Sequence, residues 1–157
     1  MRASYLIVVG VDGSDGGRRA LDWAATEATN RGGAVQAVIA WSWDGVDFGP
    51  VPATYPEEAR RRASDMLDRE IKELRRRRGS QVPVAAEVIE GRPADVLSAA
   101  GSAGDLLVLG SHGHSRVRHT VLGSVSEECI RKAASPVVVI PVPVDRHEPA
   151  SEPALRS

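Results

Sequence analysis

The residues Asp105-Leu-Leu-Val-Leu-Gly110-Ser-His-Gly113 carry the clearest fold signal in the chain. Their Leu-Leu-Val-Leu centre is a strand-sized apolar run, which is typical of a strand covered on both faces of a parallel sheet. The run stops at glycine, serine and histidine, residue types that favour a turn or loop. In open parallel sheets, ligands bind beyond the carboxyl ends of the strands. This stretch therefore indicates both a buried strand and a candidate binding loop.

The same alternation of short apolar runs and helical stretches extends in both directions from this segment. We predict strands at 5–11, 34–41, 82–89, 105–110 and 136–141. We predict helices at about 16–31, 56–78, 94–100 and 124–134. Strands that alternate with helices favour an α/β fold with a mainly parallel sheet. A chain of 157 residues suits one domain, because a second core of normal size would not fit.

Apolar side chains at helical spacing indicate which helix faces are buried. The first predicted stripe is Leu21, Ala24, Ala25 and Ala28, and the second is Ala63, Leu67, Ile71 and Leu74. In the last helix we expect Val125, Cys129, Ile130 and Ala133 to face inward. The arginine run 75–78 is interpreted as a solvated helix end, favourable to the helix dipole.

Composition excludes several classes of function. The net charge of −1 gives no general attraction to nucleic acid or to an anionic membrane. No apolar run approaches the roughly 20 residues that cross a bilayer. The single cysteine, Cys129, excludes an intrachain disulfide. No signal peptide is recognised, so we expect a cytoplasmic protein with one folded domain, 1–142, and a disordered proline-rich tail, 143–157.

The loop 110–124 combines features that favour an anion. Glycines at Gly110, Gly113 and Gly123 let the backbone turn sharply and approach a ligand closely. The sequence Ser124-Val-Ser-Glu127 is a capping box and predicts a helix start at Ser124, where free N–H groups would face a phosphate. The loop contains neither a Walker A sequence nor a Rossmann fingerprint.

Structural interpretations compete with each of these features. The glycines could serve only as strand-exit turns, and Asp12, after the first strand, could cap a helix or form a turn. The loop histidines His112, His114 and His119 invite a zinc hypothesis, which we set aside because carboxylate and cysteine partners are not nearby in the sequence.

The spacing Gly110-x2-Gly113-x9-Gly123-Ser124 resembles the ATP-binding signature of the universal stress protein family. Three further segments match in the correct order, and the resemblance covers residues 5–142. They are Val11-Asp-Gly-Ser14, Gly91-x-Pro93-Ala94 and Ser135-Pro-Val-Val-Val-Ile-Pro141. The resemblance implies a single open, doubly wound, five-stranded parallel sheet in the order 3-2-1-4-5, with helices on both faces.

The resemblance also implies roles for individual residues. Asp12 would meet the adenosine part of the nucleotide, and Trp41 would approach adenine mainly through its backbone. The phosphates and ribose would be held by Gly110, Gly113, Gly123, Ser124 and Ser126. Mg²⁺ or Mn²⁺ would accompany the phosphates, with no metal ligand assigned to the protein itself. A homodimer would form through the last strand, Val137 to Ile140, whose apolar edge is of a kind that pairs with another chain.

Three functions follow from these expectations. The first is an ATP-binding stress-response or regulatory protein. The second is an enzyme, either a slow ATPase or a phosphoryl or adenylyl transferase, for which the sequence offers no clear catalytic group. The third is a nucleotide-free dimeric scaffold, against which the intact glycine signature argues. AMP or a cyclic nucleotide could replace ATP, because the adenosine contacts would be shared.

Overall fold

A computed structural model describes residues 4–43, 55–114 and 122–142. The loop histidine His119 and the tail 143–157 lie outside the described residues. Strands and helices alternate along the described chain, as predicted. They are β1 (Leu6–Gly10), α1 (Asp15–Arg31), β2 (Ala34–Trp41), α2 (Pro56–Arg78), β3 (Val84–Glu90), α3 (Pro93–Ser102), β4 (Leu106–Gly110), α4 (Ser124–Lys132) and β5 (Val137–Ile140).

The five described strands form one parallel sheet in the order β3-β2-β1-β4-β5. This order confirms the expected topology. The strand order reverses between β1 and β4, which are neighbours in the sheet, with Val9 opposite Val108. Their carboxyl ends, Gly10 and Gly110, therefore lie close together at the switch point where doubly wound sheets open a crevice.

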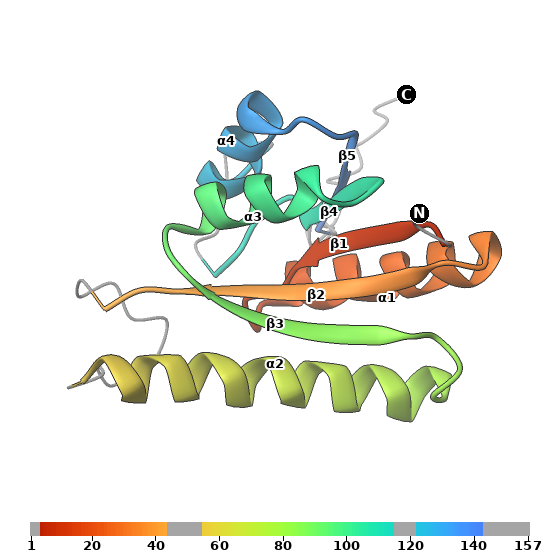
Figure 1. Cartoon of the computed structure of the whole chain (residues 1–157), viewed down its shortest axis with the longest axis horizontal. Coiled ribbons are helices and arrows are strands. Elements are labelled where there is room, and N and C mark those ends of the chain that lie inside the picture. Colours follow the sequence, from red (N-terminus) through yellow and green to blue (C-terminus); the bar gives the residue numbers. More distant parts are fainter. Residues whose placement is uncertain (1–3, 44–54, 115–121, 143–157) are drawn as a thin grey trace, which may run out of the picture.

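Two hydrophobic layers cover the sheet, one on each face. The helices α1 and α2 pack on one face, and α3 and α4 pack on the other (Figure 1). Alternate residues of β1 pack into opposite layers: Ile7 and Val9 belong to the α1/α2 core, while Val8 belongs to the α3/α4 core. All three side chains are fully buried, which explains why β1 is apolar without a polar face.

The apolar stripes predicted for the two long helices are confirmed. Leu21, Ala24, Ala25 and Ala28 of α1 are buried, and so are Ala63, Leu67, Ile71 and Leu74 of α2. Helix α1 begins at Asp15, because Ser14 caps it by accepting a hydrogen bond from the Gly17 N–H at 3.1 Å. Gly32 ends the helix in the left-handed conformation, with φ of 63°.

The prediction for the last helix was wrong at two points. Helix α4 ends at Lys132 rather than at residue 134, because Ala133 is already extended and the chain must enter β5 through Pro136. Ile130 does not face inward and is 47% exposed. The buried residues of this nine-residue helix are Ser126 and Cys129, three positions apart, so the buried stripe is narrower than the apolar pattern indicated.

The arginine run 75–78 forms the solvated helix end that the sequence predicts. All four arginines are exposed in the last turn of α2. Two of them also bridge helices: Arg77 and Arg78 contact the Asp22 carboxylate of α1 at 3.3 and 3.2 Å. The third strand, β3, begins at Val84 rather than at the predicted residue 82, because Pro83 has no N–H to donate to the neighbouring strand.

Within the described residues, the helices are too short or too polar to cross a membrane.

Candidate functional site

A cavity of about 310 Å³ opens at the carboxyl ends of β1 and β4. Its wall joins two chemically different regions. One region is apolar and consists of Val38, Ala40, Pro93, Leu97 and Leu109. The other carries the glycine and serine residues singled out in the sequence. Six of the seven predicted site residues line the cavity: Asp12, Gly110, Gly113, Gly123, Ser124 and Ser126.

Asp12 directly follows β1 and its carboxylate is oriented by the next turn. Its Oδ1 accepts a hydrogen bond from the Ser14 N–H at 2.9 Å and another from the Ser14 hydroxyl. The competing turn interpretation is therefore correct as a description of Asp12, since this is the local bond pattern of an aspartate turn. The turn and a ligand role are compatible, because the same residue lines the cavity.

Gly110 has a packing role of its own. A Cβ at Gly110 would lie 2.7 Å from the carbonyl group of Gly16, at the start of α1. A Cβ on Gly16 would in turn collide with the His112 carbonyl oxygen. Two backbones meet here with no room for side chains, so the exit of β4 rests directly on the first turn of α1. The strand-exit interpretation thus applies to Gly110, whereas Gly113 faces the Asp12 carboxylate.

The N-terminus of α4 forms the polar wall of the cavity. Its N-cap is Gly123, and no side chain caps the first turn. The predicted capping box is therefore not formed, although the helix does begin at Ser124. Ser124 is exposed and borders the cavity, while Ser126 is buried and donates from its hydroxyl to the Ser111 carbonyl at 2.9 Å. First-turn N–H groups without a side-chain cap are a favourable environment for an anion.

Ser111 is a structural residue that sequence reasoning missed. Its carbonyl accepts from the Gly123 N–H at 2.6 Å, and its hydroxyl accepts from the Val142 N–H at 3.1 Å. The buried Ser111 thereby ties the end of β4 to the start of α4 and to the segment after β5. A serine immediately after a buried strand was the available signal, but its partners lie 12 and 31 positions away.

Trp41 is the predicted site residue that does not line the cavity. Its side chain packs against the α1/α2 core, on the opposite face of the sheet from α3. Its carbonyl oxygen accepts from the Gly91 N–H at 2.8 Å. Ala40, one position earlier, points into the α3/α4 layer and lines the cavity. The adenine contact through the Trp41 backbone stays a prediction.

The histidines of the loop differ in their placement. His114 lines the cavity, and its Nε2 donates to the Asp12 carbonyl oxygen at 2.6 Å. His112 also lines the cavity and places its Nδ1 3.1 Å from the Ser111 hydroxyl. Arg116 and Arg118, which add positive charge to the same loop in the sequence, lie outside the described residues. Among the residues that are described, no cluster of three or more His, Cys, Asp or Glu side chains is arranged to hold a metal ion.

An ion-pair network fixes α4 against α3 behind the cavity. Lys132 Nζ lies 2.6 Å from Asp95 Oδ1 and 2.9 Å from Glu128 Oε2, and Arg92 reaches both carboxylates. The hydrogen bond from Lys132 lowers the pKa of Asp95 and that of Glu128. Between the helices, burial raises the pKa of the Cys129 thiol. The helix whose N-terminus borders the cavity is therefore held by charges at its other end.

Comparisons with known proteins point to one family. A universal stress protein of Mycobacterium tuberculosis H37Rv is 34% identical over 150 residues, which are 92% of this chain and 46% of that protein. A second one from the same strain is 32% identical over 139 residues, 85% of this chain and 44% of that protein. The chain thus spans about half the length of these curated relatives.

Solved structures give the same result. A universal stress protein from Archaeoglobus fulgidus, in complex with dAMP, has 26% identity and a TM-score of 0.64, covering 88% of this chain and 99% of that one. A universal stress protein in complex with cAMP has 24% identity and a TM-score of 0.64, covering 88% and 98%, and shows the fold alone. The profile of the universal stress protein family matches residues 6–141. The chain belongs to the universal stress protein family.

Proposed function

We propose that this chain is a regulatory protein that binds an adenine nucleotide, in the first instance ATP, in the cavity between β1 and β4. The observation that carries the proposal is the division of that cavity into an apolar wall and a polar wall. The apolar wall, which includes Val38 and Leu97, suits a flat base. The polar wall ends in the uncapped first turn of α4, which suits phosphates.

A related structure supports an adenine nucleotide over other anions. The Archaeoglobus fulgidus relative was solved with dAMP, which carries adenine. The glycine spacing of this chain adds support for a longer phosphate chain. A divalent cation, Mg²⁺ or Mn²⁺, would then be coordinated by the phosphates, since the described residues offer no metal-ligand cluster of their own.

The first experiment measures the nucleotide content of the purified protein by denaturation and anion-exchange chromatography, followed by calorimetric titration with ATP, AMP, cAMP and GTP. The variant is Gly113→Val, because a Cβ at this exposed position would lie 2.7 Å from Asp12 Oδ2 and occupy the cavity. The matched control is Ala99→Val, an exposed position on α3 that does not line the cavity. Circular dichroism verifies the folding of both.

Each outcome has a defined meaning. ATP bound by the wild type and by Ala99→Val, but not by folded Gly113→Val, supports the proposal. Recovery of ADP in place of ATP shifts the proposal towards a slow ATPase, and a preference for AMP or cAMP changes the ligand within the same site. No copurified nucleotide and no heat with any of the four ligands would defeat the proposal and leave a nucleotide-free dimeric scaffold.

We also propose that β5 pairs with a second copy of the chain. This strand is an edge of the sheet and its four residues are half-buried. The Pro136 carbonyl accepts from the Leu107 N–H of β4, and the Ile140 carbonyl accepts from the Ser111 N–H directly after β4. Because successive residues of a strand direct their backbone groups to alternate sides, those of Val137 and Val139 point away from β4. Such an edge is a template for pairing with another strand.

A further inference from the structure

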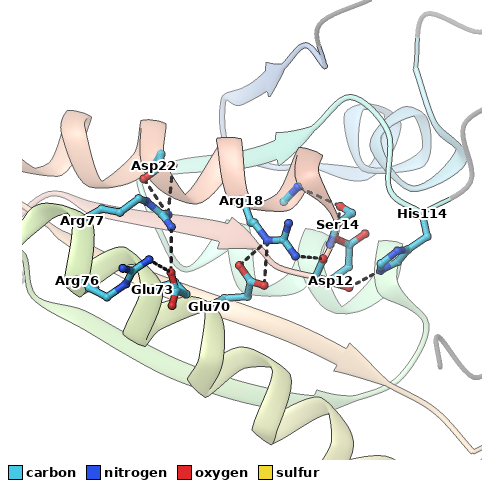
Figure 2. A network of polar contacts seen from close by, with 11 residues as sticks. Asp12, Ser14, Arg18, Asp22, Glu70, Glu73, Arg76, Arg77 and His114 are labelled. Atoms are coloured by element: carbon cyan, nitrogen blue, oxygen red, sulfur yellow. Dashed lines mark hydrogen bonds and ion pairs between the residues drawn. The ribbon is translucent and has the colours of Figure 1, made fainter. Parts of the chain in front are cut away.

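Arg18 connects helix α2 to the turn that carries Asp12. Its Nε lies 3.2 Å from both carboxylate oxygens of Glu70, and its Nη2 donates to the Gly13 carbonyl oxygen at 3.0 Å (Figure 2). Glu70 is 5% exposed, whereas the Arg18 side chain is about half exposed. A buried carboxylate requires a partner, so Glu70 holds the guanidinium in one orientation.

The Gly13 carbonyl that Arg18 contacts belongs to a peptide group that also donates a hydrogen bond to Asp12. The Gly13 carbonyl and the Ser14 N–H belong to the same peptide unit and point in opposite directions, because the peptide is trans. Arg18 holds the carbonyl end, and the N–H end donates to Asp12 Oδ1 at 2.9 Å. Rotation of this one peptide plane would break both bonds.

The peptide needs such a restraint because of the conformation of Gly13. This residue has φ of 78°, in the left-handed region that glycine enters at little cost. Glycine also leaves other orientations of the plane accessible. The second peptide contact of Asp12, from His114 Nε2 to the Asp12 carbonyl at 2.6 Å, restrains the backbone but not the carboxylate. The orientation of the carboxylate thus depends on the plane that Arg18 holds, together with the Ser14 hydroxyl, which also donates to Asp12 Oδ1.

We propose that Arg18, oriented by Glu70, is a positioning residue of the ligand site: it fixes the Gly13–Ser14 peptide and through it the carboxylate of Asp12. The inference rests on the proposed nucleotide function and names a residue pair outside the cavity wall. Arg18 itself is therefore not expected to touch the nucleotide. Its effect reaches the adenosine part of the nucleotide, where Asp12 is expected, and does not depend on the phosphates.

The same two helices supply a matched control. At the far end of their contact, Asp22 of α1 pairs with Arg77 of α2 (Figure 2). Arg78 pairs with the same carboxylate. Asp22 lies one helical turn beyond Arg18, and its carboxylate bonds to Arg77 and Arg78 rather than to the Gly13–Ser14 peptide. Asp22→Asn and Glu70→Gln therefore each remove one carboxylate charge from an α1–α2 ion pair, but only Glu70→Gln affects the turn.

The test compares wild type with Arg18→Met, Glu70→Gln and Asp22→Asn. Calorimetry gives the dissociation constants of ATP and adenosine, and thermal unfolding gives the midpoint of each protein. Arg18→Met should raise the dissociation constants of ATP and adenosine by the same factor, about fivefold to tenfold, which corresponds to the loss of one hydrogen bond. Glu70→Gln, which keeps an oxygen acceptor, should weaken both less. Asp22→Asn should leave both constants unchanged even where it lowers the midpoint.

A second readout needs no ligand. The ¹H–¹⁵N resonance of Ser14 reports the bond to the Asp12 carboxylate, so it should move in Arg18→Met and stay in place in Asp22→Asn. Equal affinities in all variants, with an unmoved Ser14 resonance, would overturn the inference while leaving nucleotide binding intact. A wild type that binds neither ATP nor adenosine would overturn the proposed function and this inference together. If Arg18→Met unfolds, Glu70→Gln keeps the comparison with Asp22→Asn decisive.

Discussion

Replacement of Ser124 by glutamate should stabilise the protein and weaken ATP binding at the same time. Ser124 is the first residue of α4, is exposed, and borders the polar wall of the cavity. A carboxylate there would interact favourably with the helix dipole, and this should stabilise the fold by about 0.3–1 kcal/mol. It would also lie beside the place proposed for the phosphates.

The electrostatic effect on binding follows from Coulomb's law. Two unit charges about 5 Å apart repel by about 1 kcal/mol in water and about 3 kcal/mol at an effective dielectric constant of about 20. The exposure of Ser124 favours the lower value. One phosphate charge at that distance would therefore weaken ATP binding about fivefold. Adenosine carries no such charge, so its affinity should not change.

The assay is calorimetric titration of wild type, Ser124→Glu and Ser124→Gln with ATP and with adenosine, together with the thermal midpoint of each protein. Ser124→Gln controls for side-chain size. Equal ATP affinity in Ser124→Glu and Ser124→Gln would refute the placement of phosphates at the start of α4. A parallel loss of adenosine affinity would attribute the effect to blocked space instead of charge.

Three further predictions concern stability, assembly and the thiol. The pKa values of Asp95 and Glu128 are lowered by their pairs with Lys132, so these pairs stabilise the fold above the unfolded pKa of each carboxyl group. The stabilisation is lost as the pH falls through the lower pKa of the folded state. Lys132→Met should flatten the decline of the thermal midpoint below about pH 5, and an unchanged decline would count against this network. Val139→Pro removes an outward N–H from β5 and should shift the protein towards monomer in light scattering, whereas an unchanged mass would exclude pairing through this edge. Because burial raises the pKa of the Cys129 thiol, native protein should react slowly with a thiol reagent until denaturant is added; fast labelling would contradict the burial.

The helices and strands could be predicted from the sequence wherever burial produces a regular pattern of apolar residues. The strand β1 is covered on both faces, so its residues are apolar throughout, and α2 has a regular stripe that includes Leu67 and Ile71. The strand order came from the resemblance to a family and not from periodicity. The inward face of α4 was misjudged because Ile130 follows the apolar pattern but is exposed.

The candidate site was only half predictable. Much of its polar wall comes from the segment that joins β4 to α4, so glycine spacing reveals it, whereas Asp12 comes from the turn after β1. Its apolar wall is built from β2, α3 and β4, and residues such as Ala40 and Pro93 become neighbours only after the sheet has formed. Arg18 and Glu70 are 52 positions apart. In the sequence each looks like an ordinary charged residue of an amphipathic helix, and no local pattern links the two.

The shallow anchoring of α4 has a consequence for how the protein could report its occupancy. Helix α4 buries two residues, whereas α1 buries seven. Little apolar area opposes the local unfolding of α4, so its amides should exchange with solvent through small openings that leave the sheet intact. A ligand held by the first turn of α4 would bind only the closed form and slow that exchange. Ligand binding would thus change how often α4 opens, while the rest of the protein surface stays the same.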